Sequence, residues 1–235
     1  MASSLEGLFR RVSWDDFKGF PNQAERRRLE AAQANAGPGK TVGMAGIAPD
    51  FTVIWGTSSP KEPNLIPVAG TSPVQYVLAD TIVVTATVKQ ARSWKQIEPL
   101  PPAAQALLLQ HEQGHYDATA LVARDCFIAL MRLKGRTFGS VKEGRKEAAD
   151  IVHEHRTKLD AIQVAYDFDT TDGAWESFGS LGLRKGLLQL KWEGYFTRAR
   201  TETRSPVDGD VPQSPDGVPY KKTLADILTG AGERI

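Results

Sequence analysis

The chain has 235 residues, of which 41% are apolar, enough to bury the core of one large domain or two small ones. Its 29 basic and 28 acidic residues nearly cancel, which excludes the strongly cationic surface of a sequence-independent nucleic-acid binder. The single cysteine, Cys126, excludes an internal disulfide and is expected to be a small core residue within a helix.

The N-terminal segment "MASSLEGLFRRVSWDDF" lacks the basic start, the continuous apolar run and the small-residue cleavage site of a secretory signal. No later segment reaches the length of a membrane span, so no membrane partner is expected. Three explanations of the missing signal stay open for the location of the protein: a signal has been removed, the protein is intracellular, or it is exported by a system that reads no such signal.

Strand signals dominate the first hundred residues. β-Branched and aromatic residues, bounded by Gly, Pro and Ser, occur in "FTVIW" (51–55) and "VQYVLADTIVVTATV" (74–88). They predict a small antiparallel sheet. Before them, "QAERRRLEAAQANAG" (23–37) combines helix-forming residues with a glycine stop and predicts a short helix.

A long helix is predicted after the strands. Pro101 and Pro102 suit its first turn, and about thirty residues without proline follow before "LKGR" (133–136) ends it. "SVKE" (140–143) then forms a capping box that opens a second helix. The apolar stripe of this second helix should pack on the first, and its members are Ala148, Val152, His155, Leu159, Ile162 and Tyr166.

Beyond residue 173 the pattern weakens. "GLLQLKWEGYFTRAR" (186–200) suggests a strand or hairpin, and "SPVDGDVPQSPDGVP" (205–219) suggests a turn-rich linker. "YKKTLADILTGAG" (220–232) predicts a short helix closed by Gly230.

The chemistry of the sequence concentrates in "LLLQHEQGHYDATALVAR" (107–124). On a helix, His111 and His115 lie about 40° apart and one turn apart, close enough to hold one ion between them. Two imidazoles suit zinc at roughly 2.1 Å, and a catalytic site needs a third protein ligand and an open position for water. Glu112 would then act as general base. The alternative is that both histidines are packing residues of an ordinary helix.

The motif and its surroundings resemble a known family. "HEQGHYD" (111–117) followed by "LVAR", with "SWDDFKG" (13–19), "RSW" (92–94) and "YDFDTTDG" (166–173) in the same order, is similar to the bacterial predicted secreted zinc-dependent proteases catalogued as a domain of unknown function. The resemblance runs from about residue 12 to about residue 175 and implies a zincin-like metalloprotease that is secreted. The chain departs from the family at Asp172, which stands where the family usually has histidine.

Several residues compete for the third ligand. The resemblance favours Asp167, with Thr170 steadying its carboxylate, whereas helical periodicity favours Asp169, and Asp172 is a further alternative. His155 lies on the apolar stripe, where a histidine is more often a core residue than a ligand. Tyr166 is a candidate to donate a hydrogen bond to a developing oxyanion, or else a packed core residue.

Together these observations predict an α+β fold of zincin-like type, in which a small antiparallel sheet packs on the long motif helix and a second amphipathic helix. Residues 1–175 form the metalloprotease domain, and residues 176–235 an extension packed on the same domain. The expected function is zinc-dependent hydrolysis of a peptide or protein substrate. The alternatives are an inactive binding or assembly module on the same scaffold, and an effector protease of a secretion system.

Overall fold

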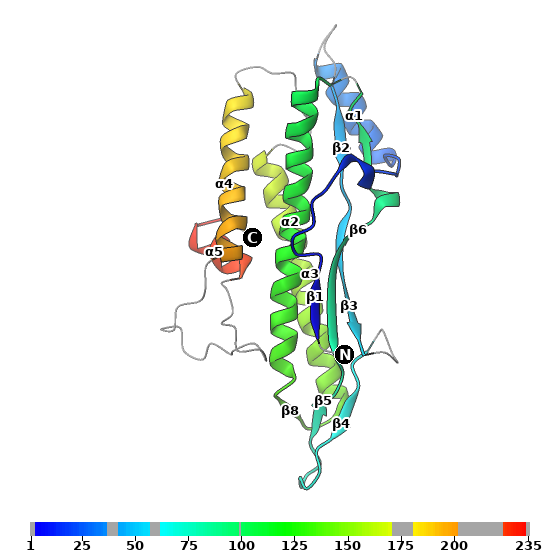
Figure 1. The fold of residues 1–235 in the computed structure, drawn as a ribbon, viewed down its shortest axis with the longest axis vertical. Coiled ribbons are helices and arrows are strands. Elements are labelled where there is room, and N and C mark those ends of the chain that lie inside the picture. The colour runs from blue at the N-terminus through cyan, green and yellow to red at the C-terminus, as the bar shows by residue number, and fades with distance from the viewer. Residues whose placement is uncertain are drawn as a thin grey trace.

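The computed structural model describes residues 3–36, 42–56, 62–98, 100–170, 181–201 and 223–233. Within them the fold is mixed α+β, as predicted, with three small sheets packed on two long helices, α2 (Pro102–Leu133) and α3 (Val141–Thr170) (Figure 1). In the same ranges, no helix combines the length and the apolar character that crossing a membrane requires.

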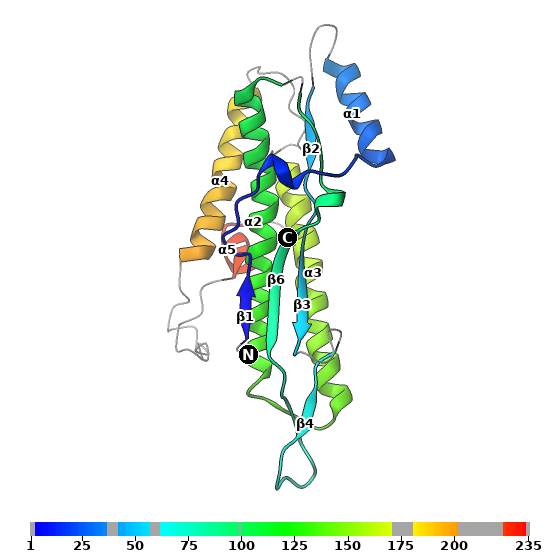
Figure 2. The same cartoon turned by 45° about the vertical axis from the view of Figure 1, so that its right-hand side comes forward.

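The largest sheet has the strand order β1-β6-β3 and follows one side of α2 (Figure 2). Its strands are β1 (Ser4–Glu6), β6 (Ile82–Val88) and β3 (Pro49–Trp55). β3 and β6 are antiparallel along seven residue pairs, from Pro49 opposite Val88 to Trp55 opposite Ile82. The antiparallel arrangement predicted for the sheet holds for β3 and β6, whereas β1, for which no strand was predicted, joins β6 in parallel. Its three residues are too few to show a periodicity.

Two smaller sheets complete the β structure. One pairs β2 (Met44–Gly46) with β7 (Trp94–Gln96), and the other has the order β4 (Leu65–Pro67), β5 (Tyr76–Leu78), β8 (Thr137–Phe138). Two short 3-10 turns, η1 (Trp14–Asp16) and η2 (Gln90–Arg92), lie outside the sheets. The predicted N-terminal helix is present as α1 (Gln23–Ala36).

Helix α2 is enclosed on nearly all sides. The sheet packs on one side of it, α3 on another and α4 (Leu181–Thr201) on a third (Figure 1). Pro101 and Pro102 open the helix as predicted, and it ends at Leu133. The segment from Ala118 to Cys126 is buried throughout, as expected of a helix that is covered on several sides, and it includes the charged residues Arg124 and Asp125.

Helix α3 returns antiparallel to α2. Ser140 Oγ accepts a hydrogen bond from Glu143 N at 3.1 Å, as an N-cap does, but the Glu143 carboxylate accepts from Gly139 N and not from Ser140. The predicted stripe faces inward, and all of its members except the partly buried Val152 are buried. The sequence therefore predicted the α2–α3 interface correctly.

The prediction of a strand or hairpin at 186–200 is wrong, because these residues belong to α4. Buried Gln189, Trp192, Phe196 and Ala199 recur at spacings of three and four, which is the period of a helix. The expected short C-terminal helix is present as α5 (Leu224–Gly230), capped by Thr223. The predicted linker at 205–219 and the boundary between residues 175 and 176 lie outside the described residues.

A buried ion pair on α2 holds both C-terminal helices. Arg124 and Asp125 contact each other at 2.7 Å and are each about 5% exposed. The Arg124 guanidinium also donates to the main-chain oxygen of Ala199 in α4, and Asp125 Oδ2 accepts from Leu224 N at 2.8 Å at the start of α5. The pair is thereby compensated by main-chain partners, which a buried charge requires.

Cys126 is expected to be unreactive while the protein is folded. It is fully buried in α2, and burial raises the pKa of its thiol to about 12, so the reactive thiolate is scarce at neutral pH. A chromogenic disulfide reagent at pH 8 should label it only as fast as the protein unfolds, and at once in concentrated urea. Rapid stoichiometric labelling without denaturant would contradict this packing.

Candidate metal centre

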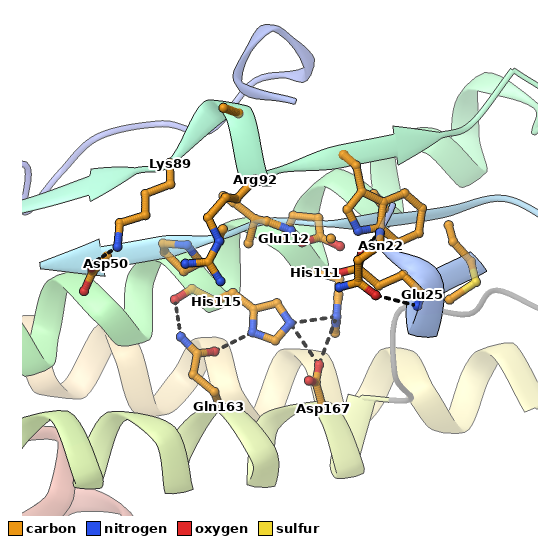
Figure 3. Close-up of a pocket in the computed structure, with 18 of the residues that line it drawn as sticks. Asn22, Glu25, Asp50, Lys89, Arg92, His111, Glu112, His115, Gln163 and Asp167 are labelled. Atoms are coloured by element: carbon orange, nitrogen blue, oxygen red, sulfur yellow. Dashed lines mark hydrogen bonds and ion pairs between the residues drawn. The ribbon is translucent and has the colours of Figure 1, made fainter. Parts of the chain in front are cut away.

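Helix α2 places His111 and His115 on one side, one turn apart, opposite Asp167 of α3 (Figure 3). His115 Nε2 lies 3.1 Å from His111 Nε2 and 2.9 Å from Asp167 Oδ1, and His111 Nε2 lies 3.6 Å from the same oxygen. A tetrahedral zinc ion with bonds of about 2.1 Å separates its ligand atoms by about 3.4 Å. The three atoms therefore already stand near the spacing that one such ion needs.

A threonine fixes the orientation of His111. Thr170 Oγ1 donates to the main-chain oxygen of Tyr166 at 2.6 Å and lies 3.1 Å from His111 Nδ1. Because a hydroxyl has one hydrogen, it must accept from Nδ1–H of the imidazole. The lone pair of His111 is then on Nε2, which faces Asp167. The sequence assigned Thr170 to the carboxylate of Asp167, but its partner is the histidine.

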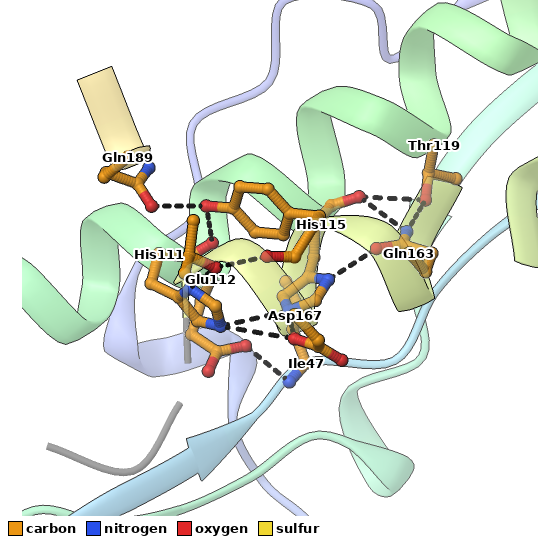
Figure 4. A network of polar contacts seen from close by, with 10 residues as sticks. Ile47, His111, Glu112, His115, Thr119, Gln163, Asp167 and Gln189 are labelled. Carbon is orange, nitrogen blue, oxygen red and sulfur yellow. Dashed lines mark hydrogen bonds and ion pairs between the residues drawn. The ribbon is translucent and has the colours of Figure 1, made fainter. Parts of the chain in front are cut away.

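A glutamine does the same for His115 (Figure 4). Gln163 Nε2 donates to the main-chain oxygen of His115 at 3.0 Å and to Thr119 Oγ1 at 3.1 Å, so its amide oxygen is left to accept from His115 Nδ1–H. In each imidazole, Nδ1 is therefore hydrogen-bonded to a side chain of α3. The Nε2 atom faces the other imidazole and Asp167 Oδ1. Such outer partners orient metal-binding histidines.

The electrostatics of the cluster favour a cation there. Burial would lower the pKa of His115, but the hydrogen bond and the charge of Asp167 outweigh it, with help from Glu112, and raise that pKa to about 9. Burial would likewise raise the pKa of Asp167, but its contacts with the two histidines hold that pKa well below its usual range. Without metal, a proton on His115 compensates the carboxylate.

Glu112 lies beside the cluster and is 1% exposed. Its Oε2 accepts a hydrogen bond from Ile47 N at 2.8 Å, in the connection between β2 and β3 (Figure 4). Within the described part of the chain, its other carboxylate oxygen has no hydrogen-bond partner. The side chain is therefore held by one oxygen and has the other available.

A cavity of about 690 Å³ opens onto this cluster. His111, Glu112, His115 and Asp167 all line it. Residues 44–50 form another part of its wall, and residues of α1, η2 and α3 also line it (Figure 3). The cavity is large enough for several residues of an extended peptide.

Tyr166 packs behind the cluster. Its ring stacks on His111 with centroids 5.0 Å apart and planes 15° apart, and its hydroxyl contacts the main-chain oxygen of His111 at 3.0 Å and Gln189 Oε1 at 2.7 Å. The side chain is fully buried, and burial raises the pKa of its phenol far above the usual value. Among the described residues it is not part of the cavity wall, so this geometry favours the packing alternative over the oxyanion role.

The other candidate ligands lie elsewhere or outside the described residues. Asp169 Oδ2 accepts from Trp192 Nε1 at 2.9 Å and faces α4. The Nδ1 of His155 contacts the Ile151 carbonyl of its own helix at 2.8 Å. Asp172 lies outside the described residues. Within those residues, His111, His115 and Asp167 are the group that brings three possible ligands together.

Sequence reasoning missed Gln163 and the main-chain amide of Ile47. A signal for Gln163 exists, because it precedes Asp167 by four residues and so shares its face of α3. Nothing in the sequence marks Ile47, since any residue there supplies the same N–H. No family model, curated protein or solved structure matches this chain.

Removing the Thr170 hydroxyl should weaken metal binding. In Thr170→Val the shape is kept but His111 Nδ1 loses its acceptor, so zinc affinity measured by competition with a chromophoric chelator should fall roughly tenfold to a hundredfold. Thr157→Val is the matched control, because Thr157 is exposed on the same helix and bonds only the His153 carbonyl. Equal affinities for the two variants would contradict the tautomer assigned to His111.

Gly114→Ala should destabilise the protein although alanine favours a helix. A Cβ at residue 114 would lie 2.1 Å from the Tyr166 hydroxyl, so overpacking should cost about 1–3 kcal/mol. Gly194→Ala, in α4, meets nothing within 4 Å and should gain up to about 1 kcal/mol. Urea unfolding curves would compare the two, and a Gly114→Ala variant as stable as Gly194→Ala would refute the close helix contact.

Proposed function

We propose that this protein is a zinc-dependent peptide hydrolase with a zincin-like fold. One observation carries the proposal: the Nε2 atoms of His111 and His115 converge with Asp167 Oδ1 in a cavity that Glu112 also lines. Two imidazoles and a carboxylate are a donor set that suits zinc. The order of motifs shared with the predicted secreted zinc-dependent proteases supports the same reaction class.

In this proposal His111, His115 and Asp167 would hold the metal at the wall of the cavity. Bound zinc supplies a lowered pKa for its water and polarises a carbonyl group. Thr170 and Gln163 keep both imidazoles in the tautomer that can bind it.

Glu112 is the proton carrier of the proposed reaction. The hydrogen bond from Ile47 N fixes one carboxylate oxygen, and the other would take a proton from the attacking water and pass it to the leaving amine. The enclosed position of Glu112 keeps competing solvent away from this transfer. The Tyr166 ring would position His111 from behind and would not contact the substrate.

Glu112→Gln should abolish most of the hydrolysis and keep the metal. Loss of the proton carrier should lower the rate on an unfolded protein substrate by about a hundredfold to ten-thousandfold, with zinc still stoichiometric by elemental analysis. Glu154→Gln is the control, because Glu154 is exposed on α3 and its one ion pair among the described residues is with Lys158.

Unchanged hydrolysis by Glu112→Gln would refute the mechanism. Zinc content that is absent in the wild type, or unaffected by His111→Ala, would refute the metal site itself. Stoichiometric zinc with no cleavage of any unfolded protein would instead identify a metal-stabilised binding module.

A further inference from the structure

We propose that Arg92 binds a carboxylate of the substrate beside the metal centre, and that the protein selects peptides with an acidic side chain or a free C-terminal carboxylate near the cleaved bond. This inference rests on the proposed function, because it concerns the substrate of the same cavity. It adds a specificity-determining residue on the opposite wall from α3.

The position of Arg92 is fixed by the turn that carries it. Arg92 N and Ser93 N both donate to the Lys89 carbonyl, at 2.8 and 3.1 Å, and close the η2 turn. Ser93 Oγ accepts from Ala48 N at 2.9 Å and ties this turn to the segment that also carries Ile47. From there the Arg92 side chain extends into the cavity on the side of His115 (Figure 3).

Within the described residues, the guanidinium of Arg92 differs from the cavity cations Lys89 and Arg156 in having no hydrogen-bond or ion-pair partner. Lys89 and Arg156 also line the cavity, but both form ion pairs with Asp50, and Arg156 donates to the Phe51 carbonyl as well. In the described part of the chain, no hydrogen bond or ion pair involves the Arg92 side chain. Its donors therefore face the space that a substrate would occupy.

Other charges in the cavity restrict where an anion can bind. Asp160 of α3 lines the cavity and forms no ion pair with Arg92 in the described structure, so an acidic group is repelled from α3 and drawn toward η2. Asp167 contacts the histidines, and Glu112 is held through one oxygen by Ile47 N, with its other oxygen left for the proposed proton transfer. Arg28 of α1 is another cavity cation without a partner among the described residues, and it is the competitor to be tested.

Carboxylate is the anion that fits these conditions. The planar guanidinium offers parallel N–H donors that match the two oxygens of one carboxylate, which a lysine ammonium cannot do. A peptide offers this group from two sources, the side chain of Glu or Asp and the C-terminus. Both place the charge within a few bonds of a scissile amide.

The test measures binding separately from turnover. Zinc-loaded Glu112→Gln protein is titrated by calorimetry with a blocked octapeptide of neutral residues in which one glutamate is moved through each position. The matching glutamine peptides are titrated beside it. A further pair, with a free or an amidated C-terminus and no glutamate, distinguishes the two sources of the carboxylate. The same titrations are repeated with Arg92→Gln, Arg92→Lys, Arg28→Gln, Asp160→Asn and Arg27→Gln added to this background.

We expect one glutamate register, or the free C-terminus, to bind about tenfold to a hundredfold more tightly than its neutral match, which is the range of a charge-assisted hydrogen bond. Arg92→Gln should remove this preference and leave the neutral peptides unaffected, and Arg92→Lys should restore only part of it. Asp160→Asn should keep it, and so should Arg27→Gln, since Arg27 is exposed on α1 and lies outside the cavity wall formed by the described residues.

Three results would overturn the assignment of Arg92. These are equal affinity for acidic and neutral peptides, a preference that survives in Arg92→Gln, and a preference lost in Arg28→Gln instead. Failure of the proposed function looks different: the acidic peptides then bind through Arg92, but the protein with Glu112 restored cleaves none of them. Cleavage without an acidic preference would retain the function and reject the subsite.

Discussion

The close contact of α3 with α2 at Gly114 determines the geometry of the candidate metal centre. Only a residue without a side chain leaves room for the Tyr166 ring there, since a Cβ would lie 2.1 Å from the phenol oxygen. The Tyr166 ring stacks on His111, and the next turn of α3 brings the Thr170 hydroxyl to Nδ1 of the same imidazole. The position of Asp167 between them follows from the helix itself.

Helical periodicity then accounts for the whole cluster. The pair His111 and His115, four residues apart on α2, meets two pairs with the same spacing on α3. Gln163 and Asp167 contact His115, and Tyr166 and Thr170 contact His111. Each imidazole is held on more than one side by residues of one rigid helix, which is how a binding site keeps its ligands in place without metal. No loop of the described structure supplies a ligand.

The parts of this arrangement that depend on local sequence could be predicted, and those that depend on a distant partner could not. The caps, the apolar stripe and the histidine spacing identified α2, α3 and their interface. Periodicity alone selected Asp169 over Asp167, because the stripe shows which residues face inward but not which neighbour they face. Asp169 bonds Trp192 of α4, and the stretch containing Trp192 was interpreted as a strand, so its partner could not be anticipated. The role of Thr170 was missed for the same reason, since His111, which donates to its hydroxyl, lies 59 residues away.

The C-terminal helices are attached to α2 partly through main-chain atoms, whereas α2 and α3 contact each other mainly through side chains. Arg124 and Asp125 recognise main-chain atoms of residues 199 and 224, and every amino acid except proline offers those atoms at both places. Side-chain size at these positions is still restricted by burial. The ion pair therefore fixes where the two helices attach, whereas the fully buried side chains of Trp192, Phe196 and Leu228 determine which helices fit there. A change of side chain at residue 199 or 224 would leave the contacts of the ion pair in place and act only through the packing.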